Sequence, residues 1–436
     1  MQTHFSPAQL ADPAMASSEG VIRKCVHCGF CTATCPTYAL LGDELDSPRG
    51  RIYLIKDMLE NERTPSAEVV KHVDRCLSCL SCMTTCPSGV NYMHLVDHAR
   101  AYIEERYERP WHERVVRRVL AAVLPNPGRF RLALDAAALA RPLAPLFAKL
   151  PGLKPLGAML ALAPSRLPPE TAAQSSLVPA AKGRVALLRG CAEPVLRPEF
   201  QDAAIRLLNR AGHDVIFAPG EGCCGALVHH MGREADSLDA ARRNVDAWTR
   251  EIEAGGLAAI LVTASGCGTT IKDYGFMLRG DPAYAEKAAH VSALAKDVSE
   301  FLAEVDLPAG DGRGLTIAYH AACSLQHGQK VVDAPKRLLA AAGYTVRTPA
   351  EAHLCCGSAG TYNILQPEIA GQLGDRKAAN LDRLNADVIA TGNIGCATQI
   401  GLRTGTPVVH TVELLDWATG GPMPAALAGR NVGKSA

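Results

Sequence analysis

Two copies of one cysteine pattern lie within the first hundred residues and constrain this chain more than any other feature. In each copy, three cysteines follow one another at steps of three residues, and a fourth comes four residues later with a proline directly after it. This pattern is typical of proteins that bind two [4Fe–4S] clusters, in which the fourth cysteine of each run ligates the other cluster. The first cluster is therefore expected on Cys25, Cys28, Cys31 and Cys86, and the second on Cys76, Cys79, Cys82 and Cys35.

Zinc is the alternative metal, since two cysteines at this spacing also suit a zinc site. A zinc site does not require the third cysteine of each run or the Cys-Pro that ends it, so the pattern favours iron–sulfur clusters. Disulfide bonds are not expected, because the sixteen cysteines gather at metal-ligand spacing and the N-terminus shows no secretory signal. We therefore expect a cytoplasmic protein. Arg49 and Arg51, between the two runs, could place positive charge near a cluster or simply face solvent.

The other eight cysteines form an internal repeat in the C-terminal half. The two sets are related by offsets of 132, 132, 132 and 129 residues, which predicts two copies of one supersecondary unit. Each copy contains a vicinal pair, and adjacent thiolates repel one another unless a cation or a cluster neutralises them. We predict a cofactor-binding role for Cys191, Cys223, Cys224 and Cys267 in the first copy and for Cys323, Cys355, Cys356 and Cys396 in the second.

Short apolar segments ahead of these cysteines predict parallel strands that alternate with helices. The cysteines would then lie beyond the carboxyl ends of the strands, where open α/β sheets bind their ligands. Gly225 and Gly357 would allow a tight turn after each vicinal pair. The expected strands are 185–188, 214–217 and 258–263 in the first copy, and 315–319, 344–347 and 387–390 in the second.

Together these features predict an α/β protein with an α-helical ferredoxin-type domain and tandem βαβ units with parallel sheets. The expected organisation is an N-terminal tail over residues 1–19, the ferredoxin-type domain over 20–108, a proline-rich helical linker over 109–182, a first unit over 183–308 and a second unit over 309–436.

The linker is both basic and apolar. Between residues 111 and 170, Lys and Arg number nine while Asp and Glu number three. Such helices suit an interface with anionic lipid, or ordinary packing on the other domains or on a partner, and the sequence leaves these roles open. No segment is long and apolar enough to predict a transmembrane helix, so we expect any membrane contact to be peripheral, on the inner face of the cell membrane.

Several phrases around the repeated cysteines resemble a known family. They are Arg189-Gly-Cys191, Gly266-Cys-Gly-Thr-Thr-Ile-Lys-Asp-Tyr274, Cys355-Cys-Gly-Ser-Ala-Gly-Thr-Tyr362 and Gly392-Asn-Ile-Gly-Cys396. The repeat resembles the CCG (cysteine-rich) domain proteins, which include components of heterodisulfide reductase and of anaerobic glycerol-3-phosphate dehydrogenase. A doubled ferredoxin-type domain followed by two CCG units is most similar to the iron–sulfur subunits of bacterial glycolate oxidases, and the resemblance covers nearly the whole chain.

This resemblance implies an electron-transfer subunit of a multi-subunit glycolate (2-hydroxy acid) dehydrogenase. FAD would lie only on partner dehydrogenase subunits, and electrons would pass from it towards quinone or another membrane acceptor. The chain itself has no G-x-G-x-x-G loop after a strand and no nucleophile–base pair, so we expect no catalytic residue and no substrate oxidation by the isolated chain. Its 45 basic and 44 acidic residues nearly cancel, which argues against a nucleic-acid partner.

The chain departs from the family's five-cysteine motif, because Thr270 and Gln399 stand where the fifth cysteine would be. We therefore expect at least one further cluster, of the cubane type, on the four cysteines of one unit, with the second unit favoured. The histidines that could also ligate are His229, His230, His320, His327 and His353.

Three other functions fit some or all of these motifs. One is the equivalent electron-transfer subunit of a glycerol 3-phosphate or D-lactate dehydrogenase. Only the identity of the partner or a substrate screen would distinguish it from the glycolate dehydrogenase subunit. Another is a heterodisulfide-reductase-like thiol–disulfide redox protein that uses the vicinal pairs without metal. The last is a zinc-stapled scaffold, which metal analysis would exclude.

Overall fold

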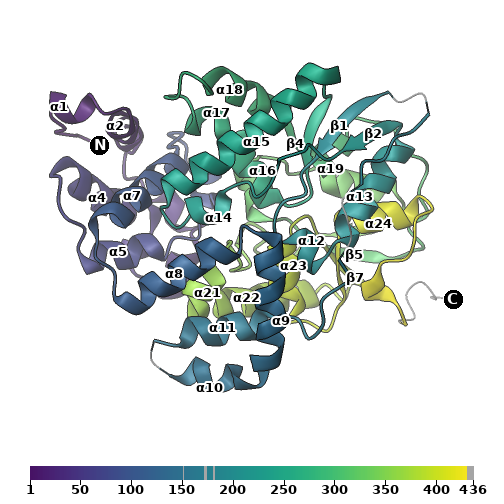
Figure 1. Cartoon of the computed structure of the whole chain (residues 1–436). Coiled ribbons are helices and arrows are strands. Elements are labelled where there is room, and N and C mark those ends of the chain that lie inside the picture. The colour runs from purple at the N-terminus through teal and green to yellow at the C-terminus, as the bar shows by residue number, and fades with distance from the viewer. Residues whose placement is uncertain (151, 171–173, 180–181, 430–436) are drawn as a thin grey trace.

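The computed structural model describes residues 1–150, 152–170, 174–179 and 182–429 (Figure 1). A helical N-terminal part is followed by four linker helices and then by two small parallel sheets with helices around them. This architecture confirms the predicted fold class. The portions of the predicted linker and second unit at 151, 171–173, 180–181 and 430–436 lie outside the described residues.

Capping residues set the starts of the N-terminal helices. Asp12, Ser47 and Ser66 each accept a hydrogen bond from a backbone N–H in the first turn of the helix that follows, which stabilises the start of that helix. The apolar faces of the helices pack into one core that includes Ile22 and Ile55. The helices are α1 (Pro7–Leu10), α2 (Pro13–Lys24), α3 (Pro36–Leu41), α4 (Pro48–Glu60), α5 (Ala67–Asp74), α6 (Ser81–Thr85) and α7 (Tyr92–Arg106), with short 3-10 turns at Phe30–Thr32 and Glu44–Asp46.

The first 19 residues differ from the tail that the sequence predicts. Helix α2 runs across the expected boundary, and Met15 and Ser18 on it are buried. Met15 joins the core around Ile22, and Ser18 Oγ lies 2.6 Å from Nδ1 of His98 on α7. The segment buries its apolar side against α7, so it packs as part of the helical domain.

Each cysteine-repeat unit contains a four-stranded parallel sheet. The strand orders are β2-β1-β3-β4 and β6-β5-β7-β8, so the two units share one topology, as the cysteine offsets predict. All six predicted strands are present, with ends that differ by one or two residues. The strands are β1 (Gly183–Leu187), β2 (His213–Ile216), β3 (Ala259–Val262), β4 (Ala295–Asp297), β5 (Thr316–His320), β6 (Thr345–Arg347), β7 (Val388–Thr391) and β8 (Val408–His410).

The sequence does not predict β4 and β8, the last strand of each sheet. Each has three residues, which is too short for a pattern of alternation or for a distinct apolar run. Strand β4 pairs with β3 through Ile260 and Leu261. Its place in the sheet therefore depends on a buried neighbour more than on its own composition.

The two units share one hydrophobic core. Val185 of β1 and Ile317 of β5 belong to the same buried cluster, and Arg206 and Arg210 of α13 pair with the buried Asp416 of α24. The first unit contains α12 (Glu193–Leu196), α13 (Glu199–Arg210), α14 (Ala226–His229), α15 (Glu234–Gly255), α16 (Ser265–Lys272), α17 (Tyr274–Met277), α18 (Ala285–Leu294) and α19 (Val298–Leu302). The second contains a π-helical turn (Ser324–Gly328), α20 (Ala334–Ala341), α21 (Tyr362–Leu365), α22 (Pro367–Asp382), α23 (Ile394–Gly401) and α24 (Thr411–Ala418).

The linker helices pack on the first cysteine-repeat unit, which is one of the roles predicted for them. Leu120 of α8 packs with Val228, and Leu134 of α9 packs with Val195. Other apolar side chains of the linker face solvent, and Leu139 is 87% exposed. No helix among the described residues is long and apolar enough to cross a membrane. The linker helices are α8 (Trp111–Val123), α9 (Pro127–Ala140), α10 (Ala144–Lys149) and α11 (Lys154–Leu162), with a 3-10 turn at Arg141–Leu143.

Candidate metal centres

The first site is a cavity in the N-terminal part. Three of its cysteines come from the loop between α2 and α3, and Cys86 follows α6. His27 and Gly29 have positive φ angles of 55° and 85°, so the backbone curls around Cys28 and brings the three thiols to one cavity. The cysteines that line it are Cys25, Cys28, Cys31 and Cys86, together with Cys82.

The second site is a neighbouring cavity built by the second cysteine run. Ser78 and Leu80 have φ angles of 49° and 61°, which repeats the curl of the first loop. Cys35 lies in this cavity, although its sequence neighbours line the other one, so the fourth cysteine of each run crosses over. Cys82 and Tyr92 line both cavities, and the two sites are therefore adjacent. The cysteines of the second site are Cys35, Cys76, Cys79 and Cys82.

Burial makes the charged form of these thiols unfavourable when no cation is present. It raises the pKa of Cys31 to about 11, and it raises the pKa of Cys79 and Cys82 well above the ordinary value. Neighbouring cysteines raise these pKa values further. Iron binds the thiolate, and its positive charge offsets both effects. Four converging cysteines at each cavity fit the donor set of a [4Fe–4S] cluster.

Arg51 of α4 brings a buried positive charge to the second site. Its side chain is 1% exposed, Nη1 lies 3.9 Å from Cys35 Sγ, and Nη2 donates to Asp46 Oδ1 at 3.2 Å. Burial disfavours this charge, but Cys76, Cys35 and Asp46 outweigh burial and raise the pKa of Arg51. Of the two arginines that the sequence leaves open, Arg51 is therefore the one buried beside a cysteine site.

Replacing Cys35 with serine should remove the second cluster and leave the first. Cys35 lies with Cys76, Cys79 and Cys82 rather than with its own run, so we expect the loss of about four of the eight ferredoxin-type irons. Iron analysis and EPR of the reduced protein measure this, and Cys31→Ser is the matched variant for the first site. Loss of the first cluster alone in Cys35→Ser would contradict the crossed arrangement.

In the first CCG-like unit, four cysteines meet beyond the carboxyl ends of β1, β2 and β3. The Cys223 thiol is hydrogen-bonded to Cys191 and Cys224, and Cys224 is also hydrogen-bonded to Cys267. The hydrogen bonds from Cys191 and Cys224 lower the pKa of Cys223, so the set favours one thiolate. After the pair, Gly225 has a φ angle of 84°, and a Cβ there would lie 3.1 Å from a backbone oxygen, so this turn requires glycine.

The second unit repeats this arrangement beyond β5, β6 and β7. Cys323 Sγ lies 3.6 Å from Cys355 Sγ, and Cys356 is hydrogen-bonded to Cys355 and Cys396. These hydrogen bonds, with a further one from His320, lower the pKa of Cys356. In each unit, the vicinal pair and the two outer cysteines therefore form one group of sulfur atoms.

A buried lysine also faces the sulfurs of the second unit. Lys377 of α22 is 2% exposed, and its Nζ donates to the backbone oxygen of Glu351 at 2.8 Å. Burial lowers the pKa of Lys377, while Cys356, Cys355 and Cys396 act in the opposite direction. A buried cation is stable only beside compensating negative charge. Thiolates in the second unit would therefore favour the charged form of Lys377, and the lysine would in turn favour the thiolates.

The second unit lies directly against the second cavity of the N-terminal part. Cys79 in that cavity belongs to one buried apolar cluster with Cys355 and Tyr362, and Cys323 packs against this cluster. Tyr362 Oη donates to the backbone oxygen of Arg75 at 2.9 Å. This contact joins two thiol sites that are more than two hundred residues apart in the chain.

The first unit meets the N-terminal part through different groups. His94 of α7 lies 2.8 Å from Asp273, and Asp97 of α7 lies 3.3 Å from His229 and close to His230. The histidines at 229 and 230 therefore contact Asp97 of α7, and among the described residues neither is grouped with the cysteines.

The remaining candidate donors have separate positions. His320 is grouped with Cys356 and Cys396, whereas His327 contacts Thr84 Oγ1 at 2.7 Å and the backbone oxygen of His353 at 3.1 Å. The two residues at the fifth-cysteine position are bonded to backbone. Thr270 Oγ1 donates to a carbonyl of its own helix at 3.4 Å, and Gln399 Nε2 donates to the Ala370 oxygen at 2.9 Å.

Family models match the three cysteine-bearing regions. A 4Fe-4S dicluster domain matches residues 24–90, and a cysteine-rich domain matches residues 185–272 and 317–401. These spans contain all sixteen cysteines.

Curated relatives match most of the chain. The glycolate oxidase iron-sulfur subunit of Escherichia coli (strain K12) is 43% identical over 96% of this chain and 99% of its own length. The probable glycolate oxidase iron-sulfur subunit of Bacillus subtilis (strain 168) is 32% identical over 92% of this chain and 95% of its own length. Lactate utilization protein A of Bacillus licheniformis is 30% identical over 53% of this chain and 99% of its own length.

One solved structure has a similar fold. A hypothetical protein from Helicobacter pylori superposes with a TM-score of 0.55 at 11% identity, over 97% of this chain and 75% of its own. At this identity the likeness concerns the fold alone.

Proposed function

Because the chain belongs to the family of glycolate oxidase iron–sulfur subunits, we propose that it is the electron-transfer subunit of a multi-subunit glycolate (2-hydroxy acid) dehydrogenase. FAD on a partner subunit takes electrons from the hydroxy acid, and this chain passes them towards quinone. The observation that carries the proposal is the packing of Cys79 with Cys355 in one buried cluster, against which Cys323 also lies. It joins the ferredoxin-type sites to a CCG site, as a path for electrons requires.

The proposal assigns the sixteen cysteines to metal centres. Two [4Fe–4S] clusters are held by the crossed cysteine sets of the N-terminal part, and at least one further cluster is held by a CCG unit. When bound, such clusters take up and release single electrons. The residues of the chain hold the thiolates, keep water out and set the local charge, and Arg51 and Lys377 place buried cations beside the second ferredoxin-type site and the second unit.

Purification of the chain with and without its partners tests the proposal. The chain alone should carry iron and sulfide but no FAD, and it should not reduce a dye with glycolate. Activity should appear when flavoprotein subunits are co-expressed, because the hydroxy acid is oxidised on them. Stoichiometric flavin in the isolated chain, or dye reduction by the chain alone, would contradict this division of labour.

A second donor is supported by one comparison. Lactate utilization protein A matches 53% of this chain at 30% identity, so lactate is the first alternative substrate, with glycerol 3-phosphate next. A panel of these compounds and 2-hydroxy acids, given to the purified complex, separates them. A thiol–disulfide function without metal would instead leave no iron signal after the ferredoxin-type cysteines are replaced.

We also propose that the linker attaches the complex to the inner face of the cell membrane. The proposal rests on solvent-exposed apolar side chains within a basic segment. Leu132 is 72% exposed, Leu139 87% and Leu146 55%, and Arg141 and Lys149 are close to them in the chain. Leucines that insert between headgroups and cations that meet anionic lipid would act together.

A Leu139→Glu/Leu146→Glu double variant should float with anionic vesicles at least tenfold less well than the unchanged complex. Each leucine that leaves water contributes about 1.5–3 kcal/mol, and about 1.4 kcal/mol is a factor of ten in affinity. Leu402→Glu is the matched control, since Leu402 is 50% exposed on the second unit. Equal loss in the control, or no flotation of the unchanged complex, would exclude this surface.

A further inference from the structure

The two CCG units differ at one buried position beside their cysteines. In the second unit, His320 is the last residue of β5, three residues before Cys323. The same offset of 132 residues leads to Leu188, three residues before Cys191. Leu188 is buried in an apolar cluster of the first unit. The repeat therefore places an imidazole in one unit where the other has a hydrocarbon side chain.

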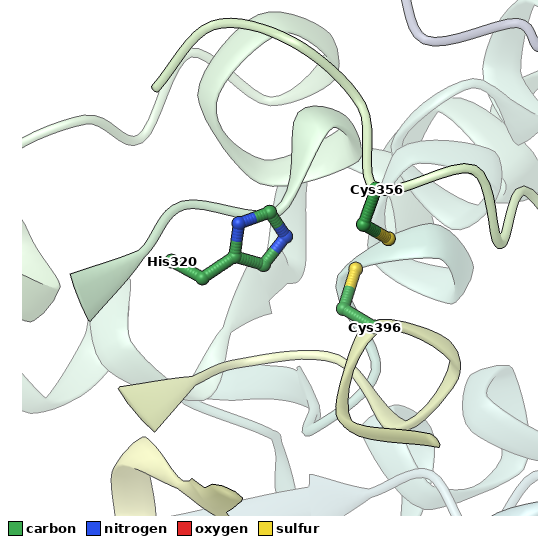
Figure 2. Close-up of side chains that lie close together, drawn as sticks. All are labelled: His320, Cys356 and Cys396. Atoms are coloured by element: carbon green, nitrogen blue, oxygen red, sulfur yellow. The ribbon is translucent and has the colours of Figure 1, made fainter. Parts of the chain in front are cut away.

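His320 points at the sulfurs of its own unit (Figure 2). One ring nitrogen and the sulfurs of Cys356 and Cys396 all lie within 4.8 Å of one another, and all three residues are buried. The ring comes from the end of β5, Cys356 from the vicinal pair and Cys396 from the start of α23. Three separate segments of the unit thus bring their donor atoms to one point.

The ring of His320 also lacks other partners. The side chain is 1% exposed, and apart from the Cys356 thiol its ring nitrogens have no hydrogen-bond partner among the described residues. Buried polar groups are nearly always bonded, and one left alone requires an explanation. His327 in the same unit shows the usual situation, with both ring nitrogens in contact with oxygen atoms.

We propose that His320 is a nitrogen ligand of the iron–sulfur cluster of the second unit, which is then held by imidazole and thiolate together. Imidazole and thiolate are both ligands of iron in such clusters, and a neutral histidine in place of an anionic thiolate raises the reduction potential. The inference rests on the proposed function, because it requires a cluster in this unit. It makes the second unit, which lies against Cys79, the acceptor from the second ferredoxin-type cluster. With both clusters bound, a histidine ligand in the second unit would favour electron transfer towards that unit, because it raises the potential of the cluster held there.

Nitrogen ligation has a direct spectroscopic signature in the full chain. We expect a pulsed-EPR coupling to one directly bound nitrogen in the reduced protein, which changes when the protein is labelled with ¹⁵N-histidine. His320→Leu should abolish this coupling, and the equivalent Leu188 indicates that a strand end of this kind accommodates leucine. His353→Leu is the matched control in the same unit and should keep it. A cluster of the second unit without nitrogen coupling would overturn the proposal even if no variant folded.

A second variant measures the effect on potential. His320→Cys replaces the imidazole with a thiolate, so at a fixed solution potential the ratio of reduced to oxidised cluster should fall at least tenfold, which is about 59 mV for a one-electron couple. An unchanged ratio would contradict ligation by His320. If the unchanged chain binds one zinc ion that His320→Leu loses, the proposal would also be overturned, because zinc is redox-inactive.

Iron and sulfide analysis separates this inference from the function on which it rests. Iron that exceeds the ferredoxin-type content and is lost in Cys356→Ser, but kept in Cys224→Ser, assigns a cluster to the second unit. If the iron content stops at about eight per chain, the further cluster of the proposed function fails, and this inference fails with it. If that cluster is present but lacks nitrogen coupling, the inference alone fails.

Discussion

A Cys79→Ser variant of the assembled complex should reduce quinone on the order of 100-fold more slowly than the unchanged complex, or slower still. Mutation of a residue that only contacts a metal ligand already lowers metal affinity or activity by about 10–100-fold. Cys79 is buried in the second cavity and packs in one cluster with Cys355 of the second unit. A serine oxygen is a harder donor than a thiolate and suits iron–sulfur clusters poorly. The variant therefore removes the centre that joins the ferredoxin-type part to the CCG units.

The measurement separates the entry of electrons from their exit. Reduction of FAD on the partner by glycolate, followed by absorbance, should continue in the variant because that chemistry precedes this chain. Ser78→Ala is the matched control: it removes the hydroxyl that accepts a 2.6 Å hydrogen bond from Arg100 but leaves every thiol in place. Quinone reduction at the unchanged rate in Cys79→Ser would mean that the second cluster lies off the path.

The cysteine sites could be predicted from the sequence because their information is local. The steps between cysteines within a run determine which thiols one loop can bring together, and the doubled pattern carries the crossing of Cys35 and Cys86 with it. The CCG units were predictable for a related reason. Apolar strands end just before Cys191 and Cys323, and parallel strands bring their carboxyl ends to one edge of a sheet.

The contacts between these units could not be predicted in the same way. Nothing near Cys79 or Cys323 in the chain indicates that they approach each other, because that depends on how two separately folded parts dock. His320 is the last residue of an apolar strand and Leu188 comes directly after one, so the strand pattern does not distinguish a ligand from a core residue. An alignment of the two repeats would have identified His320 as a candidate ligand, because it places this histidine opposite Leu188. Strands β4 and β8 could not be predicted because a strand of three residues is too short to show a periodic pattern of apolar residues.

The buried ion pair of Arg51 and Asp46 should be the most important charge pair for the stability of the N-terminal part. Asp46 is fully buried and also accepts a hydrogen bond from Arg75 at 2.8 Å. Arg51 connects three elements, since its Nε donates to the His72 oxygen at 2.6 Å and its Nη2 to Thr37 Oγ1 at 3.0 Å. Removal of the guanidinium leaves these acceptors buried with fewer partners, and such groups are costly.

Arg51→Met should accordingly lower the free energy of unfolding of the N-terminal part by about 3 kcal/mol. Breaking a buried ion pair usually costs about 3–5 kcal/mol. We expect the lower end of this range because Asp46 keeps its ion pair with Arg75. The midpoint of cluster bleaching in urea under anaerobic conditions measures this change.

The same variant should lower the potential of the second cluster, since a buried positive charge beside Cys35 stabilises the reduced, more negative state of that cluster. Arg49→Met is the control, because the Arg49–Glu44 pair is solvent-exposed and such pairs contribute little. If both variants bleach at the unchanged urea concentration, Arg51 does not stabilise this domain. If stability falls while the potential stays constant, its charge does not act on the cluster.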